Sequence, residues 1–466
     1  MSVVRTFRSL LRRGGLLRSR AGETLVQFQA DPDGLTIRSA SADVAIEYRQ
    51  SGENPAQAYC LPASSLADVE GGSLDRLTVE ADANHRIILN WTNRGVPRQA
   101  VVDPAKKELA FPEVPEAFVP NDSRLWAALQ DAAASTDKNS SRFALNCLLF
   151  HGATGRIDAT DGHHILTQAG YRFDWEDDVL IPATPLLGCK ELDQKEPIAV
   201  GRTDDWVAFG TAGFLVMHRI YKDGRFPNID QILPNAEAAK SRLTLSDSDA
   251  RFLADTLPRL PCDDELHDPV TLDLNGRVLV RARESKEARP TEVELPSSSL
   301  TGEPVMFSSN RRFVERALKL GFRDVCVYGP DSPVLCRDER RQYLWALLDK
   351  EAVVQRCGDP VRIKPSGEAS QPCTTTIKPV EVPLTVSIKN QVPAAAETRH
   401  DAKPGKPVRT RPAATAIEQV MALRDALLGV AQKAGELARS LKQQKRQARI
   451  VATTLASLKE LQKVAA

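Results

Sequence analysis

Apolar and polar residues alternate after turn glycines at three places that are evenly spaced along the chain. Segments 34–40 (GLTIRSA), 155–161 (GRIDATD) and 276–282 (GRVLVRA) begin 121 residues apart. Such alternation is typical of strands that bury one face. A second match keeps nearly the same period, because Leu61-Pro62 recurs 120 residues later as Ile181-Pro182. The pattern therefore predicts an internal repeat of roughly 120 residues.

Each repeat also contains segments that suit helices. In the third copy, 307–311 (FSSNR) takes the place of the Leu-Pro feature, and in all copies a Ser, Thr or Asn follows a strand end in a position to cap a helix. We expect helices at about 3–13, 62–70, 122–134, 184–192, 247–258 and 309–320, and closing hairpins that begin near Leu77, Ile198 and Val325. Because a unit of this length buries its own core, the sequence predicts three α+β domains in tandem, at 1–118, 119–243 and 244–350.

The chain changes character after the third repeat. Residues 353–412 contain nine of the thirty prolines, mixed with Ser, Thr and Lys, and we place an extended, disordered linker at 351–412. From 413 to 466, apolar residues recur at alternating spacings of three and four, as in Val420, Leu423 and Leu427. This spacing predicts a long C-terminal coiled-coil helix of roughly 50 residues that has a coiled-coil partner.

Charge is divided unevenly along the chain. The net charge is +1, but residues 353–466 hold 19 Lys and Arg against 9 Asp and Glu, which leaves 43 against 52 in residues 1–352. An acidic body binds DNA only where its positive charges gather on one surface, because phosphate responds to the local potential. The placement of arginines on the predicted helices therefore matters more than the total charge.

The sequence contains no recognisable catalytic, metal or cofactor motif. Segment 161–164 (DGHH) has suitable residue types, but adjacent histidines on a strand point to opposite faces and cannot readily hold one ion together. Phosphate-binding loops and nucleophile signatures are missing. The eight cysteines are scattered, which indicates reduced thiols in a cytoplasmic protein, and no apolar run is long enough to span a membrane. We expect a non-enzymatic protein that needs no cofactor.

The middle repeat contains a series of short motifs in a distinctive order. They are 141–146 (SRFALN), 148–150 (LLF), 159–163 (ATDGH), 224–227 (GRFP) and 232–234 (ILP). The third repeat continues the series with Asn310, Phe313, 332–335 (SPVL) and the last strand around Tyr343, whereas the first repeat contributes only 34–37 and Leu61-Pro62. In these motifs, residues 1–350 resemble the bacterial sliding clamps, the beta subunits of DNA polymerase III.

The resemblance implies clamp-type domains, with helices on one face and antiparallel sheets on the other, in a homodimeric ring around duplex DNA. Such a ring slides and tethers a DNA polymerase for processivity. Because sliding requires phosphate contacts without base readout, Lys and Arg on inward helices should dominate. The candidates are Arg8, Arg12, Arg13, Arg142, Arg311, Arg312, Arg316 and Lys319. For each of them the alternative is a solvated helix face.

The resemblance also implies a pocket between the second and third domains that binds short apolar peptides from polymerases and clamp loaders. The matching positions are Leu145, Thr160, Gly162, His163, Ile165, Pro227, Ile232 and Pro333. Small and apolar residues suit a concave patch, and Thr160 and His163 would orient a ligand. The alternative is that Leu145, Ile165 and Ile232 belong to the core.

The chain departs from the family pattern at several positions. Segment 346–350 (ALLDK) replaces a Met-Pro-Met-Arg strand tip, and His164 and Gln231 replace arginines. These changes put the usual peptide affinity in doubt and favour a diverged paralogue. Two functions remain open: a nucleoid-associated DNA sliding clamp, and a clamp-like scaffold that recruits partners through its coiled coil and does not encircle DNA.

Overall fold

A computed structural model describes residues 2–17, 24–72, 74–138, 144–192, 196–211, 213–262, 264 and 266–365. They all lie in one compact unit, Met1–Cys373. The predicted coiled-coil helix and the linker beyond 365 lie outside the described residues. Within the described ranges, no helix has the length and apolar character needed to cross a membrane. We call the three predicted domains repeats 1, 2 and 3.

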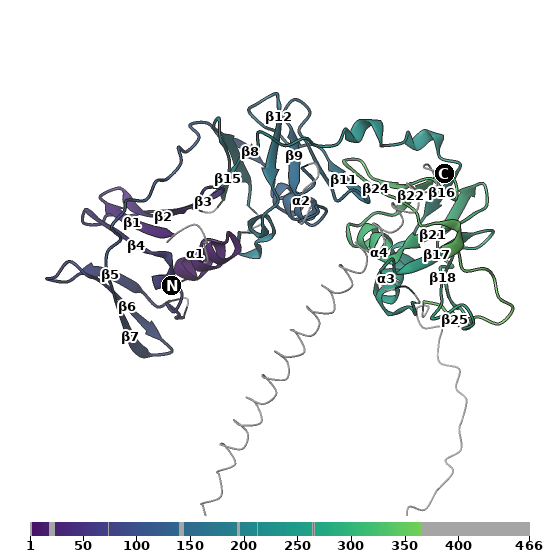
Figure 1. Ribbon diagram of the computed structural model, residues 1–466, viewed down its shortest axis with the longest axis horizontal. Coiled ribbons are helices and arrows are strands. Elements are labelled where there is room, and N and C mark those ends of the chain that lie inside the picture. Colours follow the sequence, from purple (N-terminus) through teal and green to yellow (C-terminus); the bar gives the residue numbers. More distant parts are fainter. Residues whose placement is uncertain are drawn as a thin grey trace, which may run out of the picture. The chain divides into compact units, whose positions relative to one another are not determined.

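Repeat 1 begins with a helix that is followed by two groups of strands (Figure 1). Its elements are α1 (Ser2–Arg13), β1 (Leu25–Asp31), β2 (Gly34–Ala40), β3 (Val44–Ser51), β4 (Gln57–Pro62), η1 (Ala63–Leu66), β5 (Leu77–Ala81), β6 (Ile87–Asn93) and β7 (Val96–Val102).

Repeat 2 follows the same plan, with the short strand β8 added before its helix. They are β8 (Val119–Asn121), α2 (Arg124–Ala133), β9 (Cys147–His151), β10 (Arg156–Thr160), β11 (His164–Gln168), β12 (Asp178–Pro182), η2 (Pro185–Gly188), η3 (Lys190–Leu192), β13 (Ile198–Arg202), β14 (Trp206–Thr211), β15 (Phe214–Arg219), η4 (Ile229–Gln231) and η5 (Ala236–Ala238).

Repeat 3 has the same plan, and the described chain continues beyond it. Its elements are β16 (Ser241–Thr244), α3 (Asp247–Thr256), η6 (Leu257–Arg259), β17 (Pro269–Leu274), β18 (Leu279–Ala282), β19 (Thr291–Glu294), β20 (Ser299–Gly302), β21 (Val305–Asn310), α4 (Arg311–Lys319), β22 (Asp324–Val327), β23 (Val334–Arg337) and β24 (Arg341–Trp345). The elements η7 (Lys350–Ala352) and β25 (Val361–Ile363) follow.

The predicted glycines lie at equivalent hairpins. Gly34 pairs with Asp31 in the β1–β2 hairpin, and Gly155 and Gly276 lie in the turns of β9–β10 and β17–β18. Gly155 has a φ of +65°, and a Cβ there would lie 1.9 Å from the carbonyl oxygen of Tyr171. Both the backbone angle and the close approach require glycine at this turn. The repeat read from the sequence is therefore a repeat of structure.

Two long sheets cross the boundaries between repeats. Strand β3 of repeat 1 pairs antiparallel with β15 of repeat 2, which completes a sheet in the order β4-β1-β2-β3-β15-β14-β13-β8. Strand β11 of repeat 2 pairs antiparallel with β24 of repeat 3 in the order β12-β9-β10-β11-β24-β23-β22-β16-β20. We call these pairings the first and second junctions. Equivalent strands therefore form both junctions.

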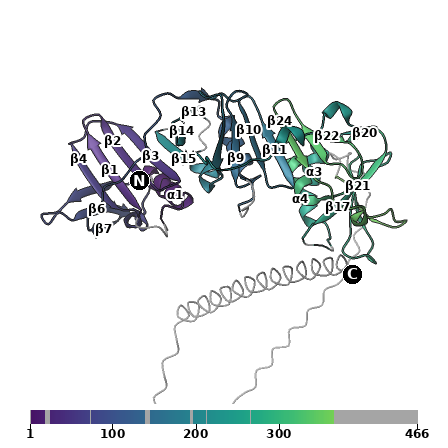
Figure 2. The same cartoon turned by 45° about the horizontal axis from the view of Figure 1, so that its top comes forward.

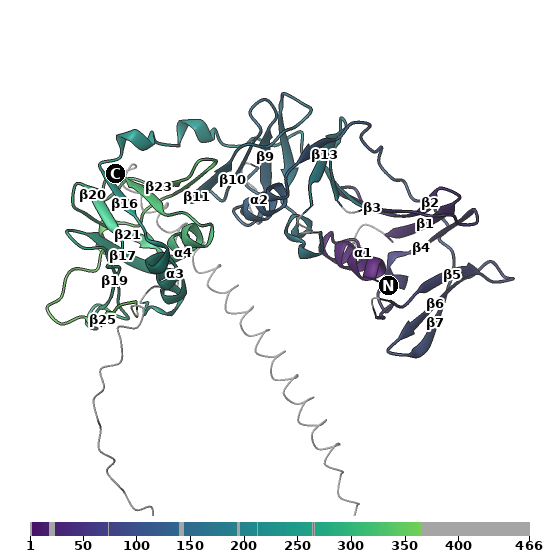
Figure 3. The same cartoon turned by 180° about the vertical axis from the view of Figure 1, so that it is seen from behind.

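The helices α1 to α4 lie on one side of these sheets in the front and rear views (Figures 1 and 3), and the tilted view shows α1, α3 and α4 (Figure 2). Helix α4 is capped by Asn310, whose side chain accepts a hydrogen bond from the Arg312 amide. Ser246 caps α3 in the same way through the Asp249 amide. These caps satisfy amides at the first turn, and they explain why both helices begin where the sequence predicts.

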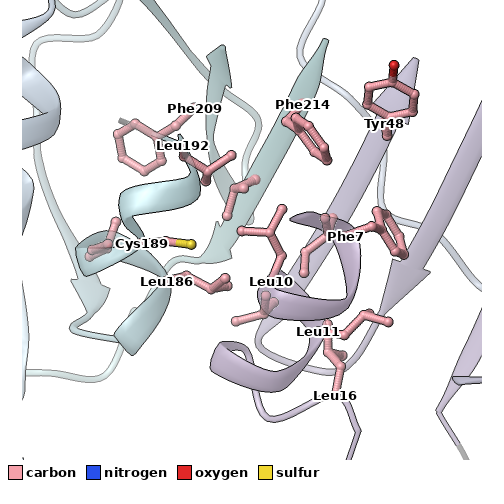
Figure 4. Packing of buried hydrophobic residues seen from close by; sticks show 14 of the residues in the cluster. Phe7, Leu10, Leu11, Leu16, Tyr48, Leu186, Cys189, Leu192, Phe209 and Phe214 are labelled. Carbon is pink, nitrogen blue, oxygen red and sulfur yellow. The ribbon is translucent and has the colours of Figure 1, made fainter. Parts of the chain in front are cut away.

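Helix α1 fills the first junction with apolar side chains. Phe7, Leu10 and Leu11 are almost completely buried, in one cluster with Phe214 of β15 and Leu186 of η2 (Figure 4). Burying a side chain of this size contributes about 1.5–3 kcal/mol. One helix of repeat 1 therefore stabilises its contact with repeat 2.

Two of the expected helices are much shorter than predicted. The segment 62–70 forms only the single turn η1, and 184–192 forms the short turns η2 and η3. Thr184 does cap η2, because its hydroxyl accepts a hydrogen bond from the Leu186 amide. After η1, however, the carbonyls of Ala67 and Val69 accept hydrogen bonds from Arg8 of α1. Contacts with α1 thus replace the expected continuation of the helix.

The structure also departs from the expected linker that starts at 351. Residues 351–365 lie against repeat 3, and β25 extends its outer sheet in the order β21-β17-β18-β19-β25. Val354 is buried, and its amide donates to the Thr271 hydroxyl at 2.8 Å. The ordered body therefore extends about fifteen residues beyond the predicted end of repeat 3.

Candidate functional site

The second junction brings the predicted peptide-pocket residues of two repeats to one end of the β11–β24 strand pair. His164 pairs with Trp345 and Ile165 pairs with Leu344 along β11 and β24. Immediately beyond the pairing, the Ala346 amide donates to the His163 carbonyl at 3.0 Å. The segment that differs from the family strand tip therefore begins directly beside His163.

The turn before β11 is held by its own side chains. The Thr160 hydroxyl donates to the His164 carbonyl at 2.6 Å and accepts from the Gly162 amide at 3.0 Å. One Asp161 carboxylate oxygen accepts from the His163 and His164 amides at 2.8 and 2.9 Å. Asp and Gly are the residues that such a turn requires, since Gly162 has a φ of +89°. Four hydrogen bonds from its own residues therefore hold this turn.

The two adjacent histidines have different surroundings. His163 is exposed, whereas His164 is buried, with its ring centroid 5.2 Å from that of Phe313 and 5.4 Å from that of Tyr343. Burial raises the pKa of Asp161, but the hydrogen bond and charge of His164 and the backbone amides outweigh burial, so the pKa of Asp161 is lowered. His163 is therefore the solvent-exposed histidine of this turn, and His164, at a position where the resemblance predicts arginine, is a core residue.

A cluster of apolar side chains lies at this end of the β11–β24 pair. Ile165 is buried in a cluster with Ile229, Leu335 and Leu344, and Phe226 and Leu233 pack against the cluster. Leu145 is half-buried and its side chain lies 3.6 Å from the position of a Cβ on Gly162. Ile232 remains 48% exposed. Ile165 is thus core, as the alternative interpretation held, whereas Leu145 and Ile232 have surface to offer a ligand.

The two predicted prolines flank the same region. Pro227 lies two residues before Ile229, which belongs to the cluster around Ile165. Pro333 is exposed and immediately precedes β23, whose Val334 pairs with Trp345 of β24. The fold therefore gathers the eight predicted positions at the second junction, and six of them keep accessible surface: Leu145, Gly162, His163, Pro227, Ile232 and Pro333.

A polar cavity of about 960 Å³ borders the pocket at Pro227. His151 lies between two carboxylates, at 2.9 Å from Asp158 and 2.8 Å from Asp178, and Arg156 pairs with Asp158 at 3.0 Å. Burial lowers the pKa of His151, but the hydrogen bond and charge of Asp158 outweigh it, and the pKa is raised. The sequence analysis missed this cluster. The sequence feature that could have revealed the cluster is Asp158, a carboxylate in the middle of the strand segment 156–160 (RIDAT).

Three of the predicted DNA-binding arginines are engaged inside the protein. Arg8 is buried and donates to the carbonyls of Ala67 and Val69. Arg311 is buried and donates to the carbonyls of Leu257, Leu260, Pro261 and Asp268. Arg316 of α4 donates to the Asp131 carbonyl and the Ser135 hydroxyl of repeat 2, at 2.6 and 2.8 Å. Their guanidinium groups hold the fold together.

The other candidates retain exposed surface, but most have an acidic neighbour. Arg13 lies 3.4 Å from Glu191, Arg312 lies 2.5 Å from Asp268, and Lys319 pairs with Glu315. Arg12 is exposed, and no ion pair to it is found within the described ranges. Arg142 lies outside the described residues. The positive potential of these helices is therefore lower than the bare count of arginines suggests.

A groove along α1 adds basic residues that the sequence analysis did not select. Its volume is about 680 Å³, and Arg5, Arg12 and Arg94 are among its lining residues. Arg5 donates to the Gly71 carbonyl at 2.7 Å and Arg94 is exposed. Arg94 comes from the β6–β7 turn, and only the folded chain brings it beside α1.

Comparison with known proteins identifies the architecture. No protein-family model and no curated protein matches the chain. A beta sliding clamp of C. crescentus aligns with a TM-score of 0.60 at 17% identity, over 74% of this chain and 98% of its own. A sliding clamp of Pseudomonas aeruginosa bound to griselimycin gives 0.61 at 15% identity, and the beta subunit of the DNA polymerase of Streptococcus pyogenes gives 0.60 at 15%, both over the same shares. The chain has the fold of these DNA polymerase III beta subunits.

Proposed function

We propose that two copies of this chain close a ring around duplex DNA and tether a DNA polymerase, without catalysis of their own. The observation that supports this proposal most strongly is the repeated junction. In both junctions the third strand of one repeat pairs with the last strand of the next. By the same rule, the third strand of repeat 3, β19, and the last strand of repeat 1, β7, would pair with a second copy. A two-fold axis would place β19 of each copy beside β7 of the other.

The proposed DNA contacts come from basic side chains that remain exposed on or beside the helix-bearing side. We assign them to Arg12, Arg13, Arg312 and Lys319, together with Arg5 and Arg94, and keep Arg142 from the sequence prediction. Arg8, Arg311 and Arg316 are left out because their guanidinium groups are occupied. Contacts of this kind read phosphate and not base sequence, so binding should weaken steeply with salt.

The proposed partner site is the second junction around His163, Leu145 and Ile232. Extended apolar peptides from a polymerase or a clamp loader would place side chains on this patch and hydrogen bonds on its rim. The sliding clamp of Pseudomonas aeruginosa was solved with griselimycin bound, which supports ligand binding by proteins of this fold. Ala346 has a smaller side chain than the methionine that the resemblance predicts at the start of the strand tip. The preferred peptide should therefore carry a larger side chain opposite Ala346.

Retention on circular DNA tests the proposed function. The full chain is incubated at high concentration with a nicked plasmid, diluted, and separated from free protein by gel filtration in high salt. A ring stays on the intact circle, because topology resists salt, and leaves after the plasmid is cut once. Equal loss from circular and linear DNA would contradict the proposal.

A second candidate is the clamp-like scaffold that does not encircle DNA. It is favoured by the internal engagement of Arg8, Arg311 and Arg316 and by the ion pairs of Arg13, Arg312 and Lys319. Deleting residues 413–466 separates the two candidates. Unchanged self-association and DNA retention would favour the clamp, whereas dissociation of the assembly would favour a scaffold that depends on the coiled coil.

A further inference from the structure

The edge that the junction rule leaves for a second copy is already covered by the chain itself. In each repeat a third strand follows the two strands of the turn-glycine hairpin and pairs with the second of them. This third strand is β3 in repeat 1, β11 in repeat 2 and β19 in repeat 3. Strands β15 and β24 cover the edges of β3 and β11, and both pair antiparallel. Strand β25 covers the β19 edge instead, and it pairs parallel.

Strand β25 belongs to a segment, 353–365, that we call the strap. Its first part is anchored firmly. Val354 is buried and donates to Thr271, and Arg356 binds both carboxylate oxygens of the buried Asp273 at 2.8 and 3.1 Å. Burial raises the pKa of Asp273, but hydrogen bonds from Arg356 and Arg281 outweigh it and lower that pKa. Removing this part would leave a buried carboxylate with one partner fewer.

The second part of the strap is held by weaker contacts. Thr291, Glu292 and Val293 pair with Val361, Arg362 and Ile363, and the Val361 amide donates to the Pro290 carbonyl at 2.9 Å. Arg362 lies 3.4 Å from Glu292, and Lys364 lies 2.7 Å from Glu294. Both basic side chains are more than half exposed. Glu292 and Glu294 are largely buried, but their strap partners are solvated cations, which salt screens more than it screens the buried anchor. This part of the strap is therefore held less firmly than the anchor.

The covered edge suits the free strand at the other end of the body. Strand β7 pairs only with β6 within the described residues, and most of its side chains are exposed. Its Arg98 is exposed, whereas β19 carries the partly exposed Glu294 and the buried Glu292, which also pairs with Arg281 at 2.8 Å. The strap offers the acidic edge two basic residues, Arg362 and Lys364, and β7 of a second copy would offer Arg98. Both β25 and β7 therefore carry positive charge that complements the acidic residues of β19.

We propose that β25 competes with the β7 strand of a second copy for the edge of β19, so that the ring closes only when the end of the strap detaches. This inference rests on the proposed function, because it assumes that β19 is the ring-closing edge. The competition is intramolecular, so the strap acts at a high effective concentration and holds dilute chains as monomers. A clamp loader or a partner that binds the strap would thereby control closure.

Self-association of the full chain tests the competition. The double variant Arg362→Glu/Lys364→Glu places acidic residues opposite Glu292 and Glu294, and Val361→Pro removes the amide that donates to Pro290. Each should lower the dimer dissociation constant about tenfold or more in sedimentation equilibrium. The control Lys222→Glu reverses a basic side chain of the same exposure as Lys364 in a surface pair of repeat 2, with Asp205 at 2.6 Å, and should leave the constant unchanged.

A further variant separates failure of the strap from failure of the ring. Adding Arg98→Glu to Arg362→Glu/Lys364→Glu should return the protein to monomer, if β7 is the strand that replaces β25. If wild type and strap variants dimerise equally, and if Arg98→Glu weakens both dimers equally, the proposed competition by the strap is wrong, whereas the proposed ring contact of β7 is retained. Strap variants that keep the wild-type melting temperature and remain monomeric at every concentration would overturn both.

Discussion

The two junctions inside the chain use equivalent strands but are stabilised by different chemistry. At the first junction, α1 inserts Phe7, Leu10 and Leu11 between repeats 1 and 2. At the second, Arg316 of α4 reaches across to the end of α2, and the ring of His164 packs against Phe313 and Tyr343. The apolar wedge buries the α1 side chains of the first junction, whereas the second junction keeps exposed side chains at His163 and Ile232. The proposed peptide site lies at the junction that keeps this exposed surface.

The apolar wedge should be the more sensitive of the two. Leu10→Ala removes a fully buried side chain, so it should lower the free energy of unfolding by about 2–5 kcal/mol. Amide exchange should rise first along β3 and β15. Chemical denaturation and hydrogen exchange measure both effects. Arg12→Ala on the exposed face of α1 is the control and should stay within about 0.5 kcal/mol; an equal loss in both variants would contradict the wedge.

Acid should weaken the first junction. His218 of β15 is completely buried, and burial lowers its pKa to about 4, below the ordinary value of 6.5. The unfolded chain therefore binds a proton that the folded chain excludes, and stability falls as the pH drops from 6.5 towards 4, by roughly 3 kcal/mol in total. Denaturant midpoints measured across this range should flatten in His218→Leu. An unchanged slope in that variant would assign the acid sensitivity to other groups.

The polar contact of the second junction should be worth less. Arg316→Ala leaves the Asp131 carbonyl and the Ser135 hydroxyl without this donor, and should cost about 1–3 kcal/mol. Arg316→Lys restores a charge without the planar fork and should recover only part of the loss. Unfolding by urea measures both variants. If Arg316→Ala instead left stability intact and reduced DNA retention, Arg316 would return to the list of DNA contacts.

The exposed part of the pocket should affect binding and hardly affect stability. Ile232→Ala truncates a side chain that is half exposed, so the free energy of unfolding should change by less than about 0.5 kcal/mol. Peptides from the polymerase and the clamp loader should bind roughly tenfold more weakly by calorimetry, since an apolar anchor is lost. Leu253→Ala, in the core of repeat 3, should show the reverse pattern, and equal peptide affinity in wild type and Ile232→Ala would move the site elsewhere.

Much of the fold could be predicted because it depends on local patterns that repeat. The glycines at 34, 155 and 276 mark equivalent hairpins, and the predicted closing hairpins begin at Leu77, Ile198 and Asp324, within one residue of expectation. The expected helices at 62–70 and 184–192 depended on tertiary contacts. Arg8 donates hydrogen bonds to the carbonyls of Ala67 and Val69 after η1, and the sequence around 62–70 does not reveal this partner, because Arg8 lies 59 and 61 residues earlier.

The candidate site could be predicted only in part. The pocket positions gather at one junction because the motifs that carry the resemblance also form the turn at Gly162. The role of Arg8 could have been read from its spacing, since it lies four residues after Val4 and three before Leu11, on the apolar face of α1. Arg311 likewise lies on the apolar face of α4, three residues before Val314 and seven before Leu318. The strap could not be predicted, because β25 is only three residues long and pairs with β19, which is distant in the sequence.

Topological capture of DNA by a covalently closed ring tests the central claim most directly. Cysteines are placed in β7 and β19 as Ala100→Cys with Thr291→Cys or Val293→Cys, in a Cys357→Ser chain that also carries Arg362→Glu/Lys364→Glu. The chain is cross-linked on a nicked plasmid and analysed in denaturant. The account predicts a doubly cross-linked dimer that stays with the intact circle and is released when the circle is cut. Cross-linked dimers that leave the intact circle in denaturant, or a failure of every β7 and β19 pair to cross-link, would contradict it.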